Sequence, residues 1–230
     1  MSWAEVFKIN SNMKKPLNEQ MRDLKFQPIR IITATGTFTP EKTGLYKVIC
    51  VGAGGDGDTY KSSSTSGTAR SASGGGGGVA IKTLRLVSTT SYNVTVGTTA
   101  SFTHESGSLS ATAGSSGDAS DGDGGTGGTA SGGDLNYSGS NGSYHTTTSY
   151  NKISPAPGSV GVFISDLSRS GESEWVVLLG ESCRIRYGDS ILGYGGSGNA
   201  VGCSTSSSAE GVSMDGLPAA VIIVPLEMEG

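Results

Sequence analysis

The segment from Gly114 to Gly142 constrains the fold of this chain more than any other, because nearly every second or third residue in it is glycine. Its only large apolar side chains are Leu135 and Tyr137. Glycine loses more backbone entropy on ordering than other residues, and a segment without side chains buries little apolar surface in return. The segment is therefore either a flexible linker or a set of extended, polyproline-II-like rods that pack closely.

The composition and charge of the chain narrow its class. The 230 residues include 38 glycines, 34% hydrophobic residues and only 16% charged residues, which differs from ordinary disordered sequences. Residues 1–47 have a net charge of +4 and the remainder has a net charge of −8. No Lys or Arg occurs from Leu86 to Asn151. Because a nucleic-acid interface needs cations on its surface, we expect no nucleic-acid partner.

The cysteines and the apolar segments indicate in which cellular compartment the protein is made. Cys50, Cys183 and Cys203 have no metal-ligand spacing, so we expect reduced, mostly buried thiols. The first ten residues lack the apolar core of a signal peptide. The longest apolar run, Leu217 to Leu226, is too short to span a bilayer and contains two prolines. We therefore expect a protein made in a reducing cytoplasm and not inserted in a membrane.

Residues 1–28 are predicted to form two short helices. Ser2 to Glu5 matches a capping box, and Pro16 and Pro28 match the start and the end of a second helix. Such short helices need a partner surface, which is either the following domain or another chain. We favour attachment to another chain, because a basic helical head precedes an acidic glycine-rich body. The candidate attachment residues are Trp3, Val6, Phe7, Leu17, Met21 and Leu24.

Residues 29–230 are predicted to form a second, mainly β domain. Ile29 to Thr39 and Leu45 to Val51 indicate a hairpin-like pair, and Leu45 to Val51 is apolar on both faces, as in a central strand. The other predicted strands are Val79–Val87, Tyr92–Val96, Ser108–Ala113, Val160–Ser165, Trp175–Leu179, Arg184–Tyr187 and Ala219–Val224. Many short strands separated by glycine- and serine-rich loops favour a β-sandwich or jelly roll.

A dinucleotide-binding pattern occurs directly after the predicted central strand. Gly52 to Gly57 fits GxGxxG, but the following residues do not favour a helix and the next strand ends without an acid. A Rossmann site needs both features. In a chain so rich in glycine, the pattern is best explained by chance.

Acidic residues in the glycine-rich segment suggest a possible cation site. Asp118, Asp121 and Asp123 are spaced as in calcium loops, which use several close oxygen ligands. No nonapeptide repeat is sustained and the glutamate of an EF-hand is missing. We favour solvated loop acids, keep calcium as an open alternative and expect no other cofactor.

Catalytic patterns are weak. His104 and His145 are the only imidazoles, neither lies in a nucleophile motif, and no GxSxG elbow occurs. Glu172 and Glu174 could in principle act as a glycosidase pair. We expect a protein that is not an enzyme, with a polysaccharide hydrolase as the alternative.

Five blocks in order carry a resemblance to a known family. They are TGTFTPEKTGLYKVICVGAGGDG, the glycine run entering VAIKTLRLVSTTSYNVTVG, SGGDLNYSGSNG, YGGSGNAVG and LPAAVIIV. Together they resemble the glycine-rich domain of tailed-phage and prophage tail proteins, over roughly Thr35 to Val224. The chain is also similar, more loosely, to long-tail-fibre adhesins whose glycine runs pack as polyglycine-II rods. Its shorter glycine runs and many Ser and Thr residues favour a β-sandwich with glycine-rich excursions over a full lattice.

The resemblance implies a role on a virion tail. It implies a tail-fibre or tail-tip component, assembled in the host cytoplasm and expected to be a homotrimer, that binds a bacterial surface glycan or outer-surface protein. Residues 1–28 would attach it to other tail-fibre or baseplate proteins. The scaffold glycines would include Gly54, Gly55, Gly74, Gly75, Gly76, Gly77, Gly78, Gly132, Gly133, Gly195 and Gly196. The intervening segments, Asp56–Ser73, Tyr137–Pro155 and Gly202–Met214, would be exposed loops.

The composition of these loops favours binding over catalysis. Flat tyrosine rings among Ser, Thr and Asn are typical of adaptable recognition surfaces, although single tyrosines also anchor long loops. The candidate receptor-binding residues are Tyr60, Tyr137, Asn141, Tyr144, His145, Tyr150 and Asn151. A multivalent particle would turn weak single sites into strong avidity. The alternatives are a tail-associated polysaccharide depolymerase and a purely structural fibre or baseplate component.

Overall fold

The fold is that of a mainly β chain in a computed structural model, which describes residues 28–61, 68–147, 151–162, 164, 167–179, 181–205 and 208–229. The predicted helices of residues 1–28 lie outside this part, except for Pro28, and so do the six candidate attachment residues and Tyr150. No helix long and apolar enough to cross a membrane occurs among the residues described.

Two five-stranded sheets face each other at one end of the molecule. The first has the order β1 (Arg30–Ile32), β20 (Ala220–Met228), β3 (Gly44–Val51), β6 (Val79–Leu86) and β11 (Leu135–Tyr137). The second has the order β10 (Ala130–Ser131), β9 (Gly107–Ala111), β8 (Ala100–His104), β7 (Tyr92–Val96) and β2 (Gly36–Phe38). Side chains of both sheets form one buried core, in which Tyr92 stacks on Phe102.

Strand β3 is central, as its sequence predicts. It pairs with β20 on one side and β6 on the other, so both of its edges are used. Tyr46, Val48 and Cys50 point into the core between the sheets, whereas Ile49 and Val51 belong to a second cluster on the other face. The prediction of a hairpin between β3 and the preceding residues is wrong, because β1 pairs with β20 and β2 pairs with β7.

The other predicted strands are mostly confirmed. Tyr92–Val96 is reproduced at both ends, and the remaining ones are shifted by a few residues at one or both ends. The exception is the stretch 160–165, whose described residues form no strand. Its Val160 N–H instead donates to the Asp189 carbonyl, 3.1 Å away.

Four smaller sheets contain the remaining strands of the described residues. Two have three strands: β12 (Tyr144–Thr147), β5 (Ala69–Ala72) and β4 (Asp58–Lys61); and β13 (Asn151–Ile153), β18 (Ala200–Ser204) and β19 (Ala209–Ser213). Two have two strands: β14 (Ser168–Arg169) with β17 (Ser190–Ile191), and β15 (Ser173–Leu178) with β16 (Glu181–Arg186). The prediction of exposed loops is therefore wrong for much of these segments, which contain β4, β5, β12, β13, β19 and part of β18.

The glycine-rich segments join the two ends as a packed lattice, which is more than the excursions expected from the sequence. Residues 74–78 lie at its centre and are hydrogen-bonded to six segments: 52–57, 112–117, 124–129, 138–143, 156–160 and 195–199. Successive N–H groups donate in three directions, from Gly74 to Gly198 O, Gly75 to Ser115 O and Gly76 to Ser140 O, before Gly77 returns to the first neighbour at Gly195 O. Three residues per turn is the period of a polyproline-II rod.

Glycine is required at the lattice centre for space. A Cβ atom on Gly75 would overlap the Thr126 carbonyl, and one on Gly76 would overlap the Ser159 carbonyl. None of residues 74–78 has a positive φ, so a side chain is excluded here by the neighbouring backbone and not by the local conformation.

Ser and Thr side chains complete the hydrogen bonding around the glycine core. Their hydroxyls accept bonds from backbone N–H groups of neighbouring rods: Ser115 from Thr126, Thr112 from Thr129, Ser140 from Ser159 and Ser143 from Ala156, at 2.7–2.8 Å. These hydroxyl-bearing residues are three apart in each rod, which matches the period of the rods. The high Ser and Thr content therefore belongs to the lattice.

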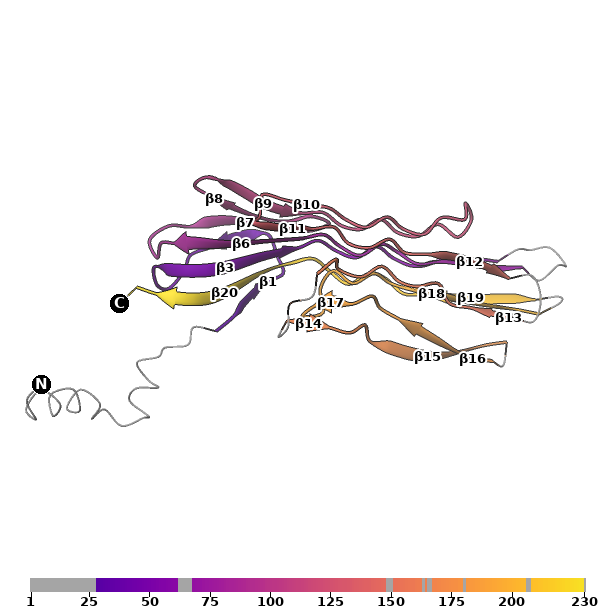
Figure 1. Cartoon of the computed structure of the whole chain (residues 1–230). Helices are drawn as coiled ribbons and strands as arrows, with labels where there is room; N and C mark the ends of the chain where they lie inside the picture. The colour runs from indigo at the N-terminus through magenta and orange to yellow at the C-terminus, as the bar shows by residue number, and fades with distance from the viewer. Residues whose placement is uncertain are drawn as a thin grey trace, which may run out of the picture.

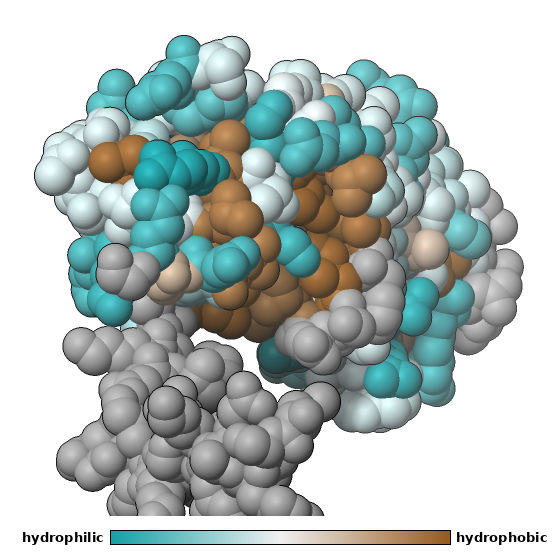
Figure 2. Space-filling view, turned by 60° about the vertical axis from the view of Figure 1, so that its left-hand side comes forward, coloured by the Kyte–Doolittle hydropathy of each residue, from teal (hydrophilic) through white to brown (hydrophobic). Residues whose placement is uncertain are grey.

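The molecule is elongated (Figure 1). The end with β1 and the last described residues of β20 is called the proximal end, and the end with β12, β13 and β19 is called the distal end. Figure 2 brings the proximal end forward and shows apolar side chains gathered in a hollow. Large side chains exposed in this half are Ile29, Ile31, Leu45, Leu135 and Leu226.

Candidate functional site: the distal sheets

The sheet of β4, β5 and β12 brings together three of the candidate receptor-binding residues. Tyr60 pairs across β4 and β5 with Arg70, and Tyr144 of β12 pairs with Ala72 of β5. His145, next to Tyr144, is exposed. Alternation along the strands places Tyr60, Arg70 and Tyr144 on one face of the sheet and His145 on the other.

Tyr60 and Arg70 form the best-defined contact of this face. Tyr60 is 42% exposed, and the Arg70 guanidinium lies over its ring at 5.4 Å from the centroid. Arg70 also donates to the Ser120 carbonyl at 3.0 Å, so its guanidinium is held from two sides. A cation over a tyrosine ring is worth about 0.5–1 kcal/mol at an exposed site. The pair therefore presents an ordered aromatic ring at the distal end.

The acidic turn of residues 118–123 packs against the same face. The Ala119 N–H donates to the Asp58 carboxylate at 2.9 Å, and a Cβ on Gly122 would contact the Tyr144 ring at 3.6 Å. Gly122 has a φ of 89°, a conformation that glycine adopts without strain. The turn thus forms one side of the surface that carries Tyr60 and Tyr144.

The aspartates of this turn stabilise the turn itself. One Asp118 carboxylate oxygen accepts bonds from the Ser120 N–H, the Ser120 hydroxyl and the Asp121 N–H at 2.6–3.0 Å. The Ser120 hydroxyl bond is the main reason that the pKa of Asp118 lies below its ordinary value. No three acidic, histidine or cysteine side chains within the described ranges converge closely enough to hold a metal ion.

The other candidate receptor-binding residues are not part of this face or lie outside the described residues. Tyr137 is in β11 of the proximal sheet, half-buried against the cluster that contains Ile81. The Asn141 side-chain oxygen accepts the Gly127 N–H at 2.8 Å, which gives it a role in the lattice. Asn151 begins β13, but its side chain is outside the described part. Tyr150 is also outside it.

The scaffold glycines predicted from the resemblance have a common structural basis. Beyond residues 74–78, a Cβ on Gly54 would overlap the Gly196 carbonyl, and one on Gly55 would overlap the Ser115 carbonyl. Gly132 and Gly195 have φ values of 77° and 81° and sit against Ser108 and Val51. Gly133 and Gly196 are similarly close to backbone atoms of Leu135 and Gly188.

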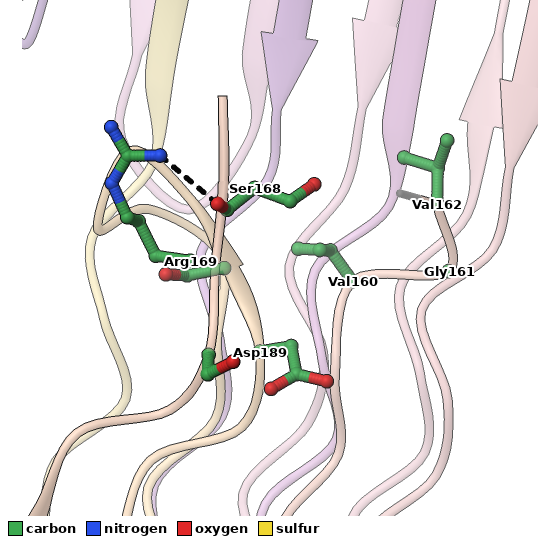
Figure 3. Close-up of a pocket in the computed structure, with 8 residues that line it drawn as sticks. Val160, Gly161, Val162, Ser168, Arg169 and Asp189 are labelled. Carbon is green, nitrogen blue, oxygen red and sulfur yellow. Dashed lines mark hydrogen bonds between the residues drawn. The ribbon is translucent and has the colours of Figure 1, made fainter. Parts of the chain in front are cut away.

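A pocket of about 300 Å³ lies near β14 and β17 (Figure 3). Asp189 is the only carboxylate among its lining residues, and one of its oxygens accepts the Gly171 N–H at 3.1 Å. The Arg169 guanidinium points away from Asp189 and donates to the Ser168 carbonyl at 3.0 Å. A two-carboxylate glycosidase needs a second acid, which the lining residues do not supply.

The two histidines are not brought together. His104 lies in β8 at the proximal end, and His145 lies in β12 at the distal end. Partial burial and nearby Lys82 lower the pKa of His104. The Nδ1 atom of His104 is 3.1 Å from the Ser106 hydroxyl, two residues away.

A family model described as a glycine-rich domain matches residues 33–221. The chain belongs to this family of glycine-rich domains. The comparison with curated proteins gives no match. The match runs from before β2 to the start of β20, so it covers strands of both five-stranded sheets, the lattice and the smaller sheets. The resemblance is therefore confirmed at the level of the glycine-rich domain.

Sequence reasoning missed two features, one in the lattice and one on β15. The first is the three-residue spacing of Ser and Thr in the rods, which is visible in Thr112 and Ser115 and again in Thr126 and Thr129. The second is Trp175, whose side chain is 69% exposed on β15. Trp175 lies between Glu174 and Val176. These neighbours do not indicate whether the tryptophan faces the solvent or the core.

Proposed function

We propose that this glycine-rich domain is a tail-fibre or tail-tip component of a tailed phage or prophage that binds the bacterial surface with its distal end. One observation carries the proposal: β1 and the end of β20 lie at the proximal end, while β12, which forms a sheet with β4 and β5, lies at the other (Figure 1). A lattice of backbone hydrogen bonds separates the two ends. Such an arrangement suits a rigid spacer that presents a binding surface away from its attachment point.

The two ends differ in the chemistry of their exposed side chains, as an attachment end and a binding end should. The proximal end exposes Ile31, Leu135 and Leu226, and apolar patches of this kind often mark protein interfaces. The distal sheet exposes Tyr60 and His145 among Ser and Thr residues, a chemistry suited to sugars and other polar ligands. We infer that the proximal end, with residues 1–28, docks onto other tail proteins. The assembled component is expected to be a homotrimer on the virion.

The test is decoration of bacterial cells by the fluorescently labelled full chain. Cells of the strain from which the prophage or phage derives should bind the protein saturably, without release of reducing sugars. The double variant Tyr60→Ala/Tyr144→Ala should lower binding at least tenfold, whereas Leu135→Ala at the proximal end should leave it unchanged. Equal binding by both variants would show that the receptor site is not at Tyr60 and Tyr144, and no binding at all would leave a purely structural role. Steady release of reducing sugars would indicate a depolymerase.

A further inference from the structure

The β15–β16 hairpin has one face packed on the molecule and one face open. Leu178, Cys183 and Ile185 pack against Val201 and Cys203 of β18. The opposite face consists of three cross-strand pairs: Ser173 with Arg186, Trp175 with Arg184, and Val177 with Ser182. Trp175 and Val177 are each 69% exposed. This six-residue surface is called the hairpin face.

The hairpin face carries positive charge without a carboxylate partner. The Arg184 guanidinium donates to the Ser173 hydroxyl at 2.9 and 2.8 Å, and within the described residues neither Arg184 nor Arg186 has an acidic group in ion-pair range. Several other cations of the domain have a carboxylate partner, as in Arg85–Glu229, Lys152–Glu181 and Lys82–Asp134. Two unpaired guanidinium groups on one face of a chain with a net charge of −4 favour an anionic ligand.

The Trp175 ring is available for stacking. Arg184 lies opposite Trp175 but is directed to Ser173, and the one cation–π contact in the described part of the chain is between Arg70 and Tyr60. Exposed tryptophan and arginine are the residues that most often dominate binding surfaces. Ser173 and Val177 are four residues apart, so the face extends about 13 Å along the strand. This length suits a short oligosaccharide.

We propose that the hairpin face binds an anionic glycan, with Trp175 stacked on a sugar ring and Arg184 and Arg186 bound to its carboxylate or phosphate groups. This inference rests on the proposed function for the choice of a surface glycan. A long, evenly charged nucleic acid is disfavoured, because residues 48–230 carry sixteen acids against eight Lys and Arg. Charges spaced along a glycan match two arginines better.

The test uses the fluorescence of Trp175. The chain has two tryptophans, so in the full-length Trp3→Phe variant Trp175 is the only indole. Polygalacturonate supplies carboxylates and a deacylated glycerol-phosphate teichoic acid supplies phosphates; dextran is the neutral control and a twelve-residue oligothymidylate is the nucleic-acid control. We expect one of the two anionic glycans to quench Trp175 saturably, with weaker binding as salt rises, and dextran to have no effect.

Variants assign the binding to the hairpin face. Arg184→Gln/Arg186→Gln in the same background should weaken binding at least tenfold, whereas Arg85→Gln, an exposed arginine at the proximal end, should not change it. Thermal unfolding shows that each variant is folded. Quenching by neither glycan, equal binding by the double variant, or tighter binding of the oligothymidylate would overturn the inference.

The result is separable from the test of the proposed function. Cells that are decorated by the protein while neither glycan quenches Trp175 would overturn the hairpin-face inference alone. Glycan binding at Trp175 by a protein that decorates no cells would overturn the proposed function and support the site.

Discussion

At the scale of single residues, the lattice depends both on the absence of Cβ atoms at its glycines and on the hydroxyl groups of its Ser and Thr residues. Without Cβ atoms, the backbones of residues 74–78 approach six neighbouring segments closely enough for direct N–H to carbonyl bonds. Hydroxyls such as those of Thr112 and Ser115 then satisfy N–H groups of the outer rods. Glycine in the centre and Ser or Thr around it are thus two requirements of one structure.

A single methyl group in the lattice centre should be strongly destabilising. In Gly75→Ala the Cβ overlaps the Thr126 carbonyl, and both rods would have to move. We expect a loss of about 1–3 kcal/mol or more in the free energy of unfolding, measured by urea denaturation. Gly36→Ala is the matched control, because its Cβ meets no atom within 4 Å. Equal stabilities of the two variants would contradict the lattice.

Asn199 joins the lattice to the distal sheets through buried hydrogen bonds. Its side-chain oxygen accepts the Ser73 hydroxyl and the Ala200 N–H, both at 2.7 Å, and its amide donates to Ser154. Asn199→Ala leaves the buried Ser73 hydroxyl without that partner and should cost about 1–3 kcal/mol in urea denaturation. The exposed Asn93→Ala should cost no more than about 0.5 kcal/mol.

Burial of Cys50 predicts a loss of stability at alkaline pH. Desolvation raises the pKa of its thiol to about 12, whereas an unfolded cysteine titrates near about 8.5. The folded chain keeps this proton where the unfolded chain loses it, so the contribution is complete below the unfolded pKa and disappears as pH rises toward about 12. Urea denaturation at pH 7 and pH 10 should show a smaller loss for Cys50→Ala than for the wild type. The same pH dependence in both would refute this assignment.

At the scale of elements, the short distal strands depend on their neighbours. A two-stranded hairpin such as β15–β16 is marginal alone in water, and its stability comes from Leu178, Cys183 and Ile185 packed on β18. The lattice and the core between the five-stranded sheets do not use these residues. The hairpin should therefore open as a separate unit.

Ile185→Ala tests this independence. Its side chain is 1% exposed, and removal should cost about 2–5 kcal/mol within the hairpin. Hydrogen exchange should show lost protection of β15 and β16 amides while residues 74–78 remain protected. Val177→Ala, on the open face of the same hairpin, should leave exchange unchanged. Simultaneous loss of protection in the lattice would show that the hairpin is not separate.

At the scale of the whole molecule, the chain crosses between the two ends many times. The central rod accepts bonds from residues 52–57 and donates bonds to residues 195–199, and β20 lies between β1 and β3. Such non-local pairings are complete only when distant segments of the chain meet. The lattice therefore joins the two ends into one structure, from which only the β15–β16 hairpin is expected to open separately.

A chain that ends at residue 187 should not fold. It lacks β20, the rod of residues 195–199 and the strands β18 and β19, so β3 loses one neighbour and the lattice loses one side. We expect a circular dichroism spectrum without β-structure and rapid proteolysis. A chain that begins at Pro28 is the control and should keep the described fold. A folded 1–187 fragment would show that these residues fold without the rest of the chain.

Four features could be predicted from the residues alone: the mainly β class, the central position of β3, the burial of the cysteines and the role of glycine in the rods. Each of these depends on side-chain size and hydropathy, which are local properties. The sequence did not predict that β1 pairs with β20 or that the rods form a lattice, because those bonds join backbone groups that every residue has.

For the candidate site, the sequence indicates the chemistry of the residues, and the tertiary structure decides their positions. Tyr60 and Tyr144 are marked by their chemistry, but only the pairing of β4, β5 and β12 brings them to one face, and it leaves Tyr137 in the proximal sheet. Asn141 accepts the Gly127 N–H because the two rods lie side by side. Trp175 is exposed because no segment of the described residues packs on its face of the hairpin. Residue types thus decide what a surface can bind, and the backbone bonds between distant segments decide which residues form that surface.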